Sequence, residues 1–145
     1  MLAGKWLERH PLEPVTVTPG TSLEEAARAM LADPGARDLY VVDAQGHPLG
    51  HLGLRQLAGL LLAPERPTHS RRQLVDRVSF ARGPVEDYMD THVLKIGRDE
   101  RISDLLHLFM ERRIEDIPVL DQAGCILGVV RLRDLLCARL DEHHG

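Results

Sequence analysis

An internal repeat is the feature that most constrains what this chain can fold into. Residues 39–57 align with residues 117–135 at an offset of 78, and eight of the 19 aligned positions are identical. The identical pairs are Val41/Val119, Asp43/Asp121, Gly46/Gly124, Leu49/Leu127, Gly50/Gly128, Leu54/Leu132, Arg55/Arg133 and Leu57/Leu135. Self-similarity at a fixed offset indicates copies of one supersecondary unit. We therefore expect one small fold to occur twice.

Each copy carries the pattern of a β-hairpin. A short apolar run ends in an aspartate, a turn closes with a glycine, and a second apolar run follows. Asp opens such turns through its side chain, and Gly closes them at low steric cost. The pattern predicts paired strands at 39–42 with 49–52, and at 117–120 with 126–130.

Helical patterns flank both hairpins. In the first copy, Thr21 and Ser22 can cap a helix whose apolar residues recur at three- and four-residue spacing from Leu23 to Leu31. Residues 102–110 repeat this spacing in the second copy. Further helices are expected at 54–62 and 132–140, and short strands at 15–17 and 94–96. Each copy therefore has the order β-α-β-β-α.

Two such copies predict the fold class. A unit of about 50 residues buries too little surface to be stable alone. We expect an α/β (α+β) fold in which two pseudosymmetric β-α-β-β-α units pack sheet to sheet. The first unit is expected at 1–62, an inter-repeat linker at 63–84 and the second unit at 85–145. The linker holds five arginines and is either a variable insertion or a segment that docks a partner or covers a bound phosphate.

Composition excludes several classes of protein. A net charge of −4 and a pI of about 6.0 argue against nucleic acid as a partner. Cys125 and Cys137 form no disulfide framework and suit a reducing compartment. No apolar run is long enough to span a membrane, and the N-terminus lacks the pattern of a signal peptide. The expected location is the cytoplasm.

Catalytic and metal-binding motifs are missing from the sequence. There is no G-x-S-x-G or G-x-x-x-x-G-K-[ST] motif, so we do not expect an enzyme. The eight histidines are scattered, with no H-E-x-x-H spacing, and we expect no metal site among them. Glu115 and Asp116 remain an alternative site for a hard cation such as Mg²⁺, which prefers oxygen ligands.

The doubled unit resembles a tandem pair of CBS domains. The similarity is carried by the helix start Pro19–Ala26, by the strand I-P-V-L-D at 117–121 and by the return strand G-V-V-R-L-R-D-L at 128–135. The segment V-E-D-Y-M-D at 85–90 is similar to the lead-in of a second CBS unit. The resemblance implies a stand-alone, non-catalytic regulatory module. Such modules bind AMP, ADP, ATP or S-adenosylmethionine between the repeats, form homodimers, and regulate an enzyme or transporter.

The resemblance also implies where a ligand would bind. The family motif G-h-h-[ST]-x-x-D ends in an aspartate that accepts hydrogen bonds from both ribose hydroxyls, and Asp134 matches it. Arg131 stands in place of the hydroxyl residue, where it could clamp a phosphate or fill the pocket and exclude the nucleotide. The expected ligand-binding residues are Asp134, Arg131, Arg133, Ile117, Pro118, Glu115 and Asp116.

The first copy departs from the same motif. Gly53 has no hydroxyl and Gln56 carries no charge, so this second, degenerate cleft is not expected to hold a ribose in the usual way. Its residues are Gln56, Gly53, Arg55 and Leu39. Two rival functions stay open: a ligand-free dimerisation scaffold, which the loss of both hydroxyl residues favours, and an Mg²⁺-sensing cytosolic module of a cation transporter.

Overall fold

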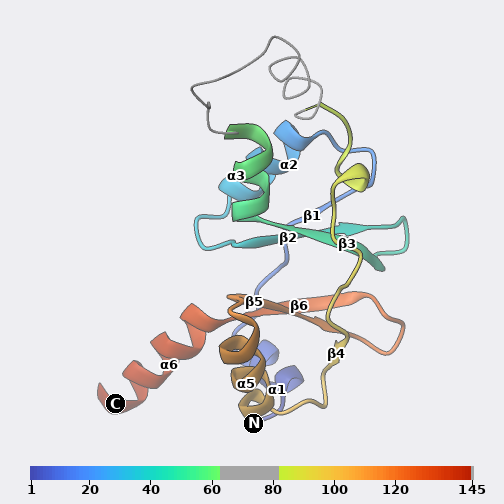
Figure 1. The fold of residues 1–145 in the computed structure, drawn as a ribbon. Helices are drawn as coiled ribbons and strands as arrows, with labels where there is room; N and C mark the ends of the chain where they lie inside the picture. The colour runs from blue at the N-terminus through green and yellow to red at the C-terminus, as the bar shows by residue number, and fades with distance from the viewer. Residues whose placement is uncertain (63–81, 145) are drawn as a thin grey trace. The chain divides into compact units, whose positions relative to one another are not determined.

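The computed structural model describes residues 1–62 and 82–144 (Figure 1). Residues 63–81 of the expected linker lie outside this range. The helices and strands follow in the order α1 (Ala3–Arg9), β1 (Thr16–Val17), α2 (Leu23–Leu31), β2 (Asp38–Val42), β3 (Pro48–Gly53), α3 (Leu54–Leu62), the 3-10 turn η1 (Val85–Asp87), β4 (Ile96–Gly97), α5 (Ile102–Arg112), β5 (Asp116–Leu120), β6 (Ile126–Arg131) and α6 (Leu132–His144).

The two repeats form two three-stranded sheets with the same topology. The strand orders are β1-β2-β3 and β4-β5-β6. In each sheet the short strand runs parallel to its neighbour, with Thr16 opposite Tyr40 in one and Ile96 opposite Val119 in the other. The mixed α/β class and the pseudosymmetric pair of β-α-β-β-α units are therefore confirmed.

Local sequence explains how these elements begin and end. The Ser22 hydroxyl accepts the Glu25 N–H at 3.1 Å and caps α2, as the sequence predicted. Both hairpin turns use a glycine with positive φ, Gly46 at 91° and Gly124 at 86°, a conformation that other residues adopt at a cost. Arg113 ends α5 in the left-handed region at φ 52°.

The compact units do not coincide with the linear division of the repeats. One, here the N-repeat unit, contains Val15–Ala44 and Leu49–His92; the other, here the C-repeat unit, contains Met1–Pro14, Gln45–Pro48 and Val93–Gly145. Each has its own apolar core. The first fourteen residues thus belong with the second repeat, because α1 buries part of its surface in that repeat's core.

Helix α1 was not expected from the sequence. Ala3, Trp6 and Leu7 are buried in the core of the C-repeat unit, and the Ala3 N–H donates to the Glu100 carbonyl oxygen at 2.7 Å. A seven-residue helix is marginal on its own, so tertiary packing must stabilise it.

On the return strand of each repeat, a glycine lets a distant stretch of backbone, here the crossing segment, pass close to the strand. The crossing segment is residues 10–12 in the C-repeat unit and residues 88–90 in the N-repeat unit. In the C-repeat unit the Val129 N–H donates to Leu12 O at 3.1 Å. In the N-repeat unit the backbones of His51 and Asp90 exchange two hydrogen bonds of 2.9 Å. Both pairs are related by the repeat offset of 78. A Cβ at Gly128 would lie 3.3 Å from Leu12 O, and one at Gly50 would lie 2.8 Å from Asp90 O. Both copies of the repeat have glycine at this position, where the backbone of another segment passes directly over it.

Among the described helices, none has the length and apolar character needed to cross a membrane.

Candidate ligand site

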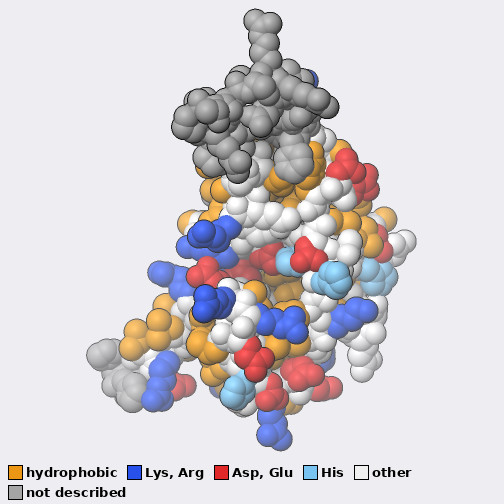
Figure 2. Space-filling model, in the orientation of Figure 1, with side chains coloured by type: hydrophobic (Ala, Val, Ile, Leu, Met, Phe, Trp, Pro, Cys, Tyr) orange, Lys and Arg blue, Asp and Glu red, His pale blue; other side chains and the backbone are white. Residues whose placement is uncertain are grey.

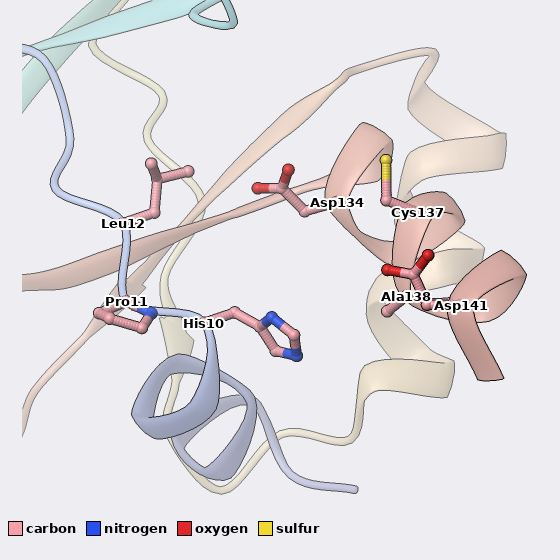
Figure 3. Close-up of a pocket in the computed structure, with 7 residues that line it drawn as sticks. All are labelled: His10, Pro11, Leu12, Asp134, Cys137, Ala138 and Asp141. Carbon is pink, nitrogen blue, oxygen red and sulfur yellow. The ribbon is translucent and has the colours of Figure 1, made fainter. Parts of the chain in front are cut away.

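A pocket lies in the C-repeat unit between the segment after α1 and one face of α6 (Figure 3). Its volume is about 280 Å³. The lining residues are His10, Pro11, Leu12, Asp134, Cys137, Ala138 and Asp141. The four residues of α6 have the i, i+3, i+4, i+7 spacing that places side chains on one helix face.

Of the residues predicted to bind a ligand, Asp134 lines this pocket. It is the third residue of α6, and its carboxylate projects from the start of the helix toward the Leu12 segment (Figure 3). The side chain is half-buried. Among the described residues, none forms a hydrogen bond or ion pair with this carboxylate. It therefore keeps its full capacity to accept hydrogen bonds from a ligand.

Gln56 occupies the corresponding place in the first repeat, and its side chain is engaged. Its Nε2 donates to Tyr88 O at 3.0 Å. Tyr88 lies 78 residues after His10, so it is the repeat equivalent of a residue that lines the pocket. The Gln56–Tyr88 bond therefore joins α3 to its crossing segment at the place where the C-repeat unit has a pocket between α6 and residues 10–12. An amide can donate to a carbonyl, whereas an ionised carboxylate cannot. The exchange of Asp for Gln therefore lets the first repeat bridge this gap.

Arg131 is placed differently from a phosphate clamp. Its Nε lies 3.3 Å from Asp116 Oδ1, and the two residues are only 7% and 5% exposed. Removing one partner of a buried ion pair leaves an uncompensated charge, so Arg131 could turn to a phosphate only at a high cost. Arg131 also does not line the pocket, and both roles considered for it, clamping a phosphate or filling the pocket and excluding the nucleotide, stay predictions.

The first repeat has an equivalent, half-buried acidic residue with a different partner. Asp38 aligns with Asp116 at the repeat offset, and its Oδ2 lies 3.0 Å from His51 Nδ1. The second ring nitrogen of His51 lies 3.6 Å from Asp90 Oδ2. Each repeat thus places a basic group of its β3 or β6 strand against the aspartate that begins β2 or β5.

Electrostatics favour a protonated His51 in this cluster. The hydrogen bond to Asp38 raises the pKa of His51 above its usual 6.5. Burial raises the pKa of Asp38 above 3.8, and the hydrogen bond with His51 offsets part of that effect. The backbone N–H of His92, at 2.8 Å, holds the pKa of Asp90 below 3.8. When His51 is protonated, it places a cation between two carboxylates and reinforces the crossing of residues 90 and 51.

The other predicted site residues do not line this pocket. Ile117 and Pro118 are buried in β5, and Leu39 is buried in β2. Glu115, Arg133 and Arg55 are exposed, and Gly53 is half-buried at the end of β3. Their assignment to a ligand stays a prediction.

Glu115 and Asp116, the alternative Mg²⁺ site, differ in their surroundings. Asp116 is buried against Arg131, whereas Glu115 is exposed. Within residues 1–62 and 82–144, no group of three His, Cys, Asp or Glu side chains is arranged to hold a metal ion.

Sequence reasoning missed most of the pocket. His10, Pro11 and Leu12 lie before the first strand of the first repeat, and Asp141 lies two helical turns beyond Asp134. Two signals could have found them. Helical spacing from Asp134 leads to Cys137, Ala138 and Asp141, and the repeat offset carries the lead-in segment 88–90 onto residues 10–12.

Comparison with known proteins agrees with this architecture. The CBS-domain family model matches residues 10–63 and 85–141. The CBS-domain protein ATU1752 from Agrobacterium tumefaciens has a TM-score of 0.75 at 22% identity, over 96% of this chain and 99% of that chain. The CBS pair of protein MJ0100, solved with 5′-methylthioadenosine and S-adenosyl-L-methionine, has a TM-score of 0.70 at 20% identity, over 100% and 98%.

A third similar structure is the cytosolic domain of the Mg²⁺ channel MgtE in complex with ATP. Its TM-score is 0.63 at 24% identity, over 86% of this chain and 44% of that one. At these identities the structural matches show the fold alone, whereas the family model matches both repeats in sequence. The chain belongs to the CBS-domain family and contains a tandem CBS pair.

Proposed function

We propose that this chain is a non-catalytic regulatory module that senses an adenosyl compound through the pocket at Asp134. The ribose hydroxyls donate to the Asp134 carboxylate, and the adenine and 5′ substituent occupy the space between α6 and the segment His10–Leu12. CBS pairs are generally regulatory modules, and binding would control an enzyme or transporter joined to or associated with this chain.

The observation that carries the proposal is the difference between Asp134 and Gln56. The two residues align in the repeat, yet Gln56 donates to the crossing segment while Asp134 borders a pocket of about 280 Å³. A half-buried carboxylate that borders a pocket and accepts from no described residue suits a ligand that brings hydroxyl donors. Two of the similar structures were solved with adenosyl ligands, which supports the same ligand class.

A homodimer is part of this proposal. Hydrophobic side chains lie at the surface over α6 (Figure 2), where Leu136 and Leu140 are 60% and 54% exposed. Met110 of α5 in the same unit is 63% exposed. Leu136 and Leu140 are four residues apart and share one face of α6, and exposed apolar patches often mark interaction surfaces. Sedimentation velocity tests this part: a dimer that Leu136→Lys with Leu140→Lys converts to monomer supports it, and a monomeric wild type refutes it.

Calorimetric titration of the purified chain with AMP, ADP, ATP, 5′-methylthioadenosine and S-adenosylmethionine tests ligand binding. We expect Asp134→Ala to weaken binding at least about ten-fold, because a hydrogen bond to a charged group contributes about 1.5–3 kcal/mol. The 2′-deoxy analogue of the tightest ligand should show a parallel loss. Asp104→Ala is the matched control, since Asp104 is also the third residue of an exposed helix start in the same unit but lies outside the pocket.

Two outcomes contradict the proposal in different ways. If Asp134→Ala binds as tightly as the wild type, the ligand lies elsewhere. If no adenosyl compound binds the wild type, the function as a ligand-free dimerisation scaffold is favoured. The contacts of Gln56 with Tyr88 O and of Arg131 with Asp116 would then be structural. A response to Mg²⁺ alone would point to the cation-sensing function.

A further inference from the structure

A titratable side chain holds the crossing segment of the N-repeat unit on β3. His51 of β3 and Asp90 of that segment exchange two backbone hydrogen bonds of 2.9 Å. The His51 ring lies between two carboxylates, with Nδ1 3.0 Å from Asp38 Oδ2 and Nε2 3.6 Å from Asp90 Oδ2. Asp38 begins β2, so the imidazole links two strands of the sheet to the crossing segment.

The groups that face His51 favour its protonated form. Asp38 faces the ring from β2 and Asp90 from the crossing segment, where the 94% exposed His92 lies with its Nδ1 3.1 Å from Asp90 Oδ1. The hydrogen bond to Asp38 raises the pKa of His51, and burial offsets only part of this effect. A neutral imidazole keeps one N–H and can donate to only one of the two carboxylates. Loss of the proton therefore weakens the side-chain link between β2 and the crossing segment.

The second repeat has no such histidine at the equivalent crossing. At the repeat offset of 78, Val129 takes the place of His51 and Leu12 takes that of Asp90. The Val129 N–H donates to Leu12 O at 3.1 Å, so the backbone contact is kept between apolar residues. The buried aspartate at the start of β5 pairs with Arg131, which stays charged at every pH that a folded protein tolerates. Of these two crossings, the one in the N-repeat unit can respond to pH near neutrality.

Other contacts fix the chain just before the crossing segment. Val85 of η1 is fully buried in the core of the N-repeat unit, and its N–H donates to Thr21 O at 2.8 Å. Shortly after the crossing segment, the C-repeat unit begins at Val93. A weaker imidazole contact would therefore free residues 90–92 without unfolding the unit. The chain that connects the two repeats would then have more free length.

We propose that the cluster of Asp38, His51 and Asp90 is a pH-sensitive clasp on the connection between the two repeats. With His51 protonated, Asp90 is held on β3 and the connection is short. When the imidazole releases its proton to solvent, residues 90–92 leave β3 more often and the connection lengthens. The signal is the proton itself, and it acts independently of any ligand in the pocket at Asp134.

The pH range of the clasp follows from its charges. Because the pKa of His51 is raised above 6.5 in the folded chain, the contact is complete below pH 6.5 and is lost as the pH rises through the folded-state pKa. Burial raises the pKa of Asp38 above 3.8, so proton uptake by this carboxyl weakens the contact again in acid. The crossing is therefore held most firmly at mildly acidic pH.

Amide hydrogen exchange of the full chain, followed by NMR and corrected for the intrinsic effect of pH, tests the clasp. The His51 and Asp90 N–H groups report on the crossing of the N-repeat unit, and the Val129 N–H reports on that of the C-repeat unit. From about pH 6 to about pH 8.5, we expect protection of the first two amides to fall about five- to ten-fold. This range lies between the effects of an exposed ion pair and of a hydrogen bond to a charged group. Protection of the Val129 amide should stay constant.

Variants separate the charge of the imidazole from its packing. His51→Gln keeps a side chain that can donate to Asp38 but does not titrate, so protection of its crossing should not depend on pH. Asp38→Asn should lower the pKa of His51, measured from its imidazole proton resonances, and move the loss of protection to lower pH. His92→Gln is the matched control, because it removes the other histidine beside Asp90 and leaves the His51 contacts in place. Its pH dependence should equal that of the wild type.

Three outcomes would overturn the clasp. The first is constant protection of the His51 and Asp90 amides while the imidazole titrates. The second is a pH dependence of the same size in His51→Gln. The third is an equal loss of protection at Val129, which would indicate general unfolding in place of a local opening. None of these measurements uses a ligand, so their outcome is independent of the proposed adenosyl site.

Discussion

Replacing Gly50 with alanine tests whether the crossing segment is held on β3 as the structure indicates. The new Cβ would lie 2.8 Å from Asp90 O and 2.6 Å from Met89 Sδ. The Met89 side chain can move, but the backbone oxygen is held by the two 2.9 Å hydrogen bonds between His51 and Asp90. Relief of the clash therefore requires the segment to shift or these bonds to lengthen.

The expected cost follows from two opposing effects. Overpacking a well-packed site costs about 1–3 kcal/mol. Restricting the unfolded chain by a Gly-to-Ala change returns about 0.4–1 kcal/mol. We expect Gly50→Ala to lower the free energy of unfolding by about 1–2 kcal/mol, measured from urea midpoints by far-ultraviolet circular dichroism. Faster hydrogen exchange at the His51 and Asp90 amides should accompany the loss.

Gly59→Ala is the control for this prediction. Gly59 belongs to α3 in the same unit, and a Cβ there meets nothing within 4 Å. Alanine in a helix interior is favoured over glycine by about 0.5–1 kcal/mol, so this variant should be more stable than the wild type. If Gly50→Ala were as stable as Gly59→Ala, the account of the close crossing at Gly50 would be wrong.

Two further predictions concern the residues that hold these segments. Because the pKa of His51 is raised in the folded state, protonation of His51 stabilises the fold fully below pH 6.5, and this contribution is lost as the pH rises through the folded-state pKa. The urea midpoint of the wild type should therefore fall above pH 6.5, and that of His51→Gln should depend less on pH. Equal pH dependence of the two midpoints would contradict the role of the Asp38–His51 contact. Trp6→Ala should cost about 3–5 kcal/mol, because Trp6 is 7% exposed in the core of the C-repeat unit; a loss under about 1 kcal/mol by the same assay would mean that α1 is dispensable.

Repetition made much of the fold predictable. The hairpins and their flanking helices follow from turn residues and apolar spacing, which act over a few neighbouring residues and are present twice. The helix expected at 54–62 is α3 (Leu54–Leu62), and the strands expected at 15–17 and 94–96 are found as β1 and β4 at Thr16–Val17 and Ile96–Gly97. Local patterns specify such elements because the determining contacts are close in sequence.

The candidate site was only partly predictable. Asp134 could be assigned because it is the last residue of a motif within one repeat. The role of Arg131 could not, because its partner Asp116 is brought to it by strand pairing, with Asp116 opposite Arg131 in the β5–β6 register. His10 and Leu12 lie before the first strand of the first repeat, yet they line a pocket against the last helix of the second.

The sequence by itself determined that one β-α-β-β-α unit occurs twice, that the family is that of the CBS domains, and that only the second repeat retains an acidic residue at the end of its motif. Tertiary structure alone decided which segments complete each unit. Helix α1 and residues 10–12 join the second repeat, and residues 88–90 join the first, through contacts between backbone groups far apart in the chain. The physical reason is that a backbone segment can pair with a distant strand where a glycine leaves room, as Leu12 does near Gly128 and Asp90 near Gly50. The apolar spacing that predicts helices and strands acts between neighbouring residues and does not identify such a distant partner.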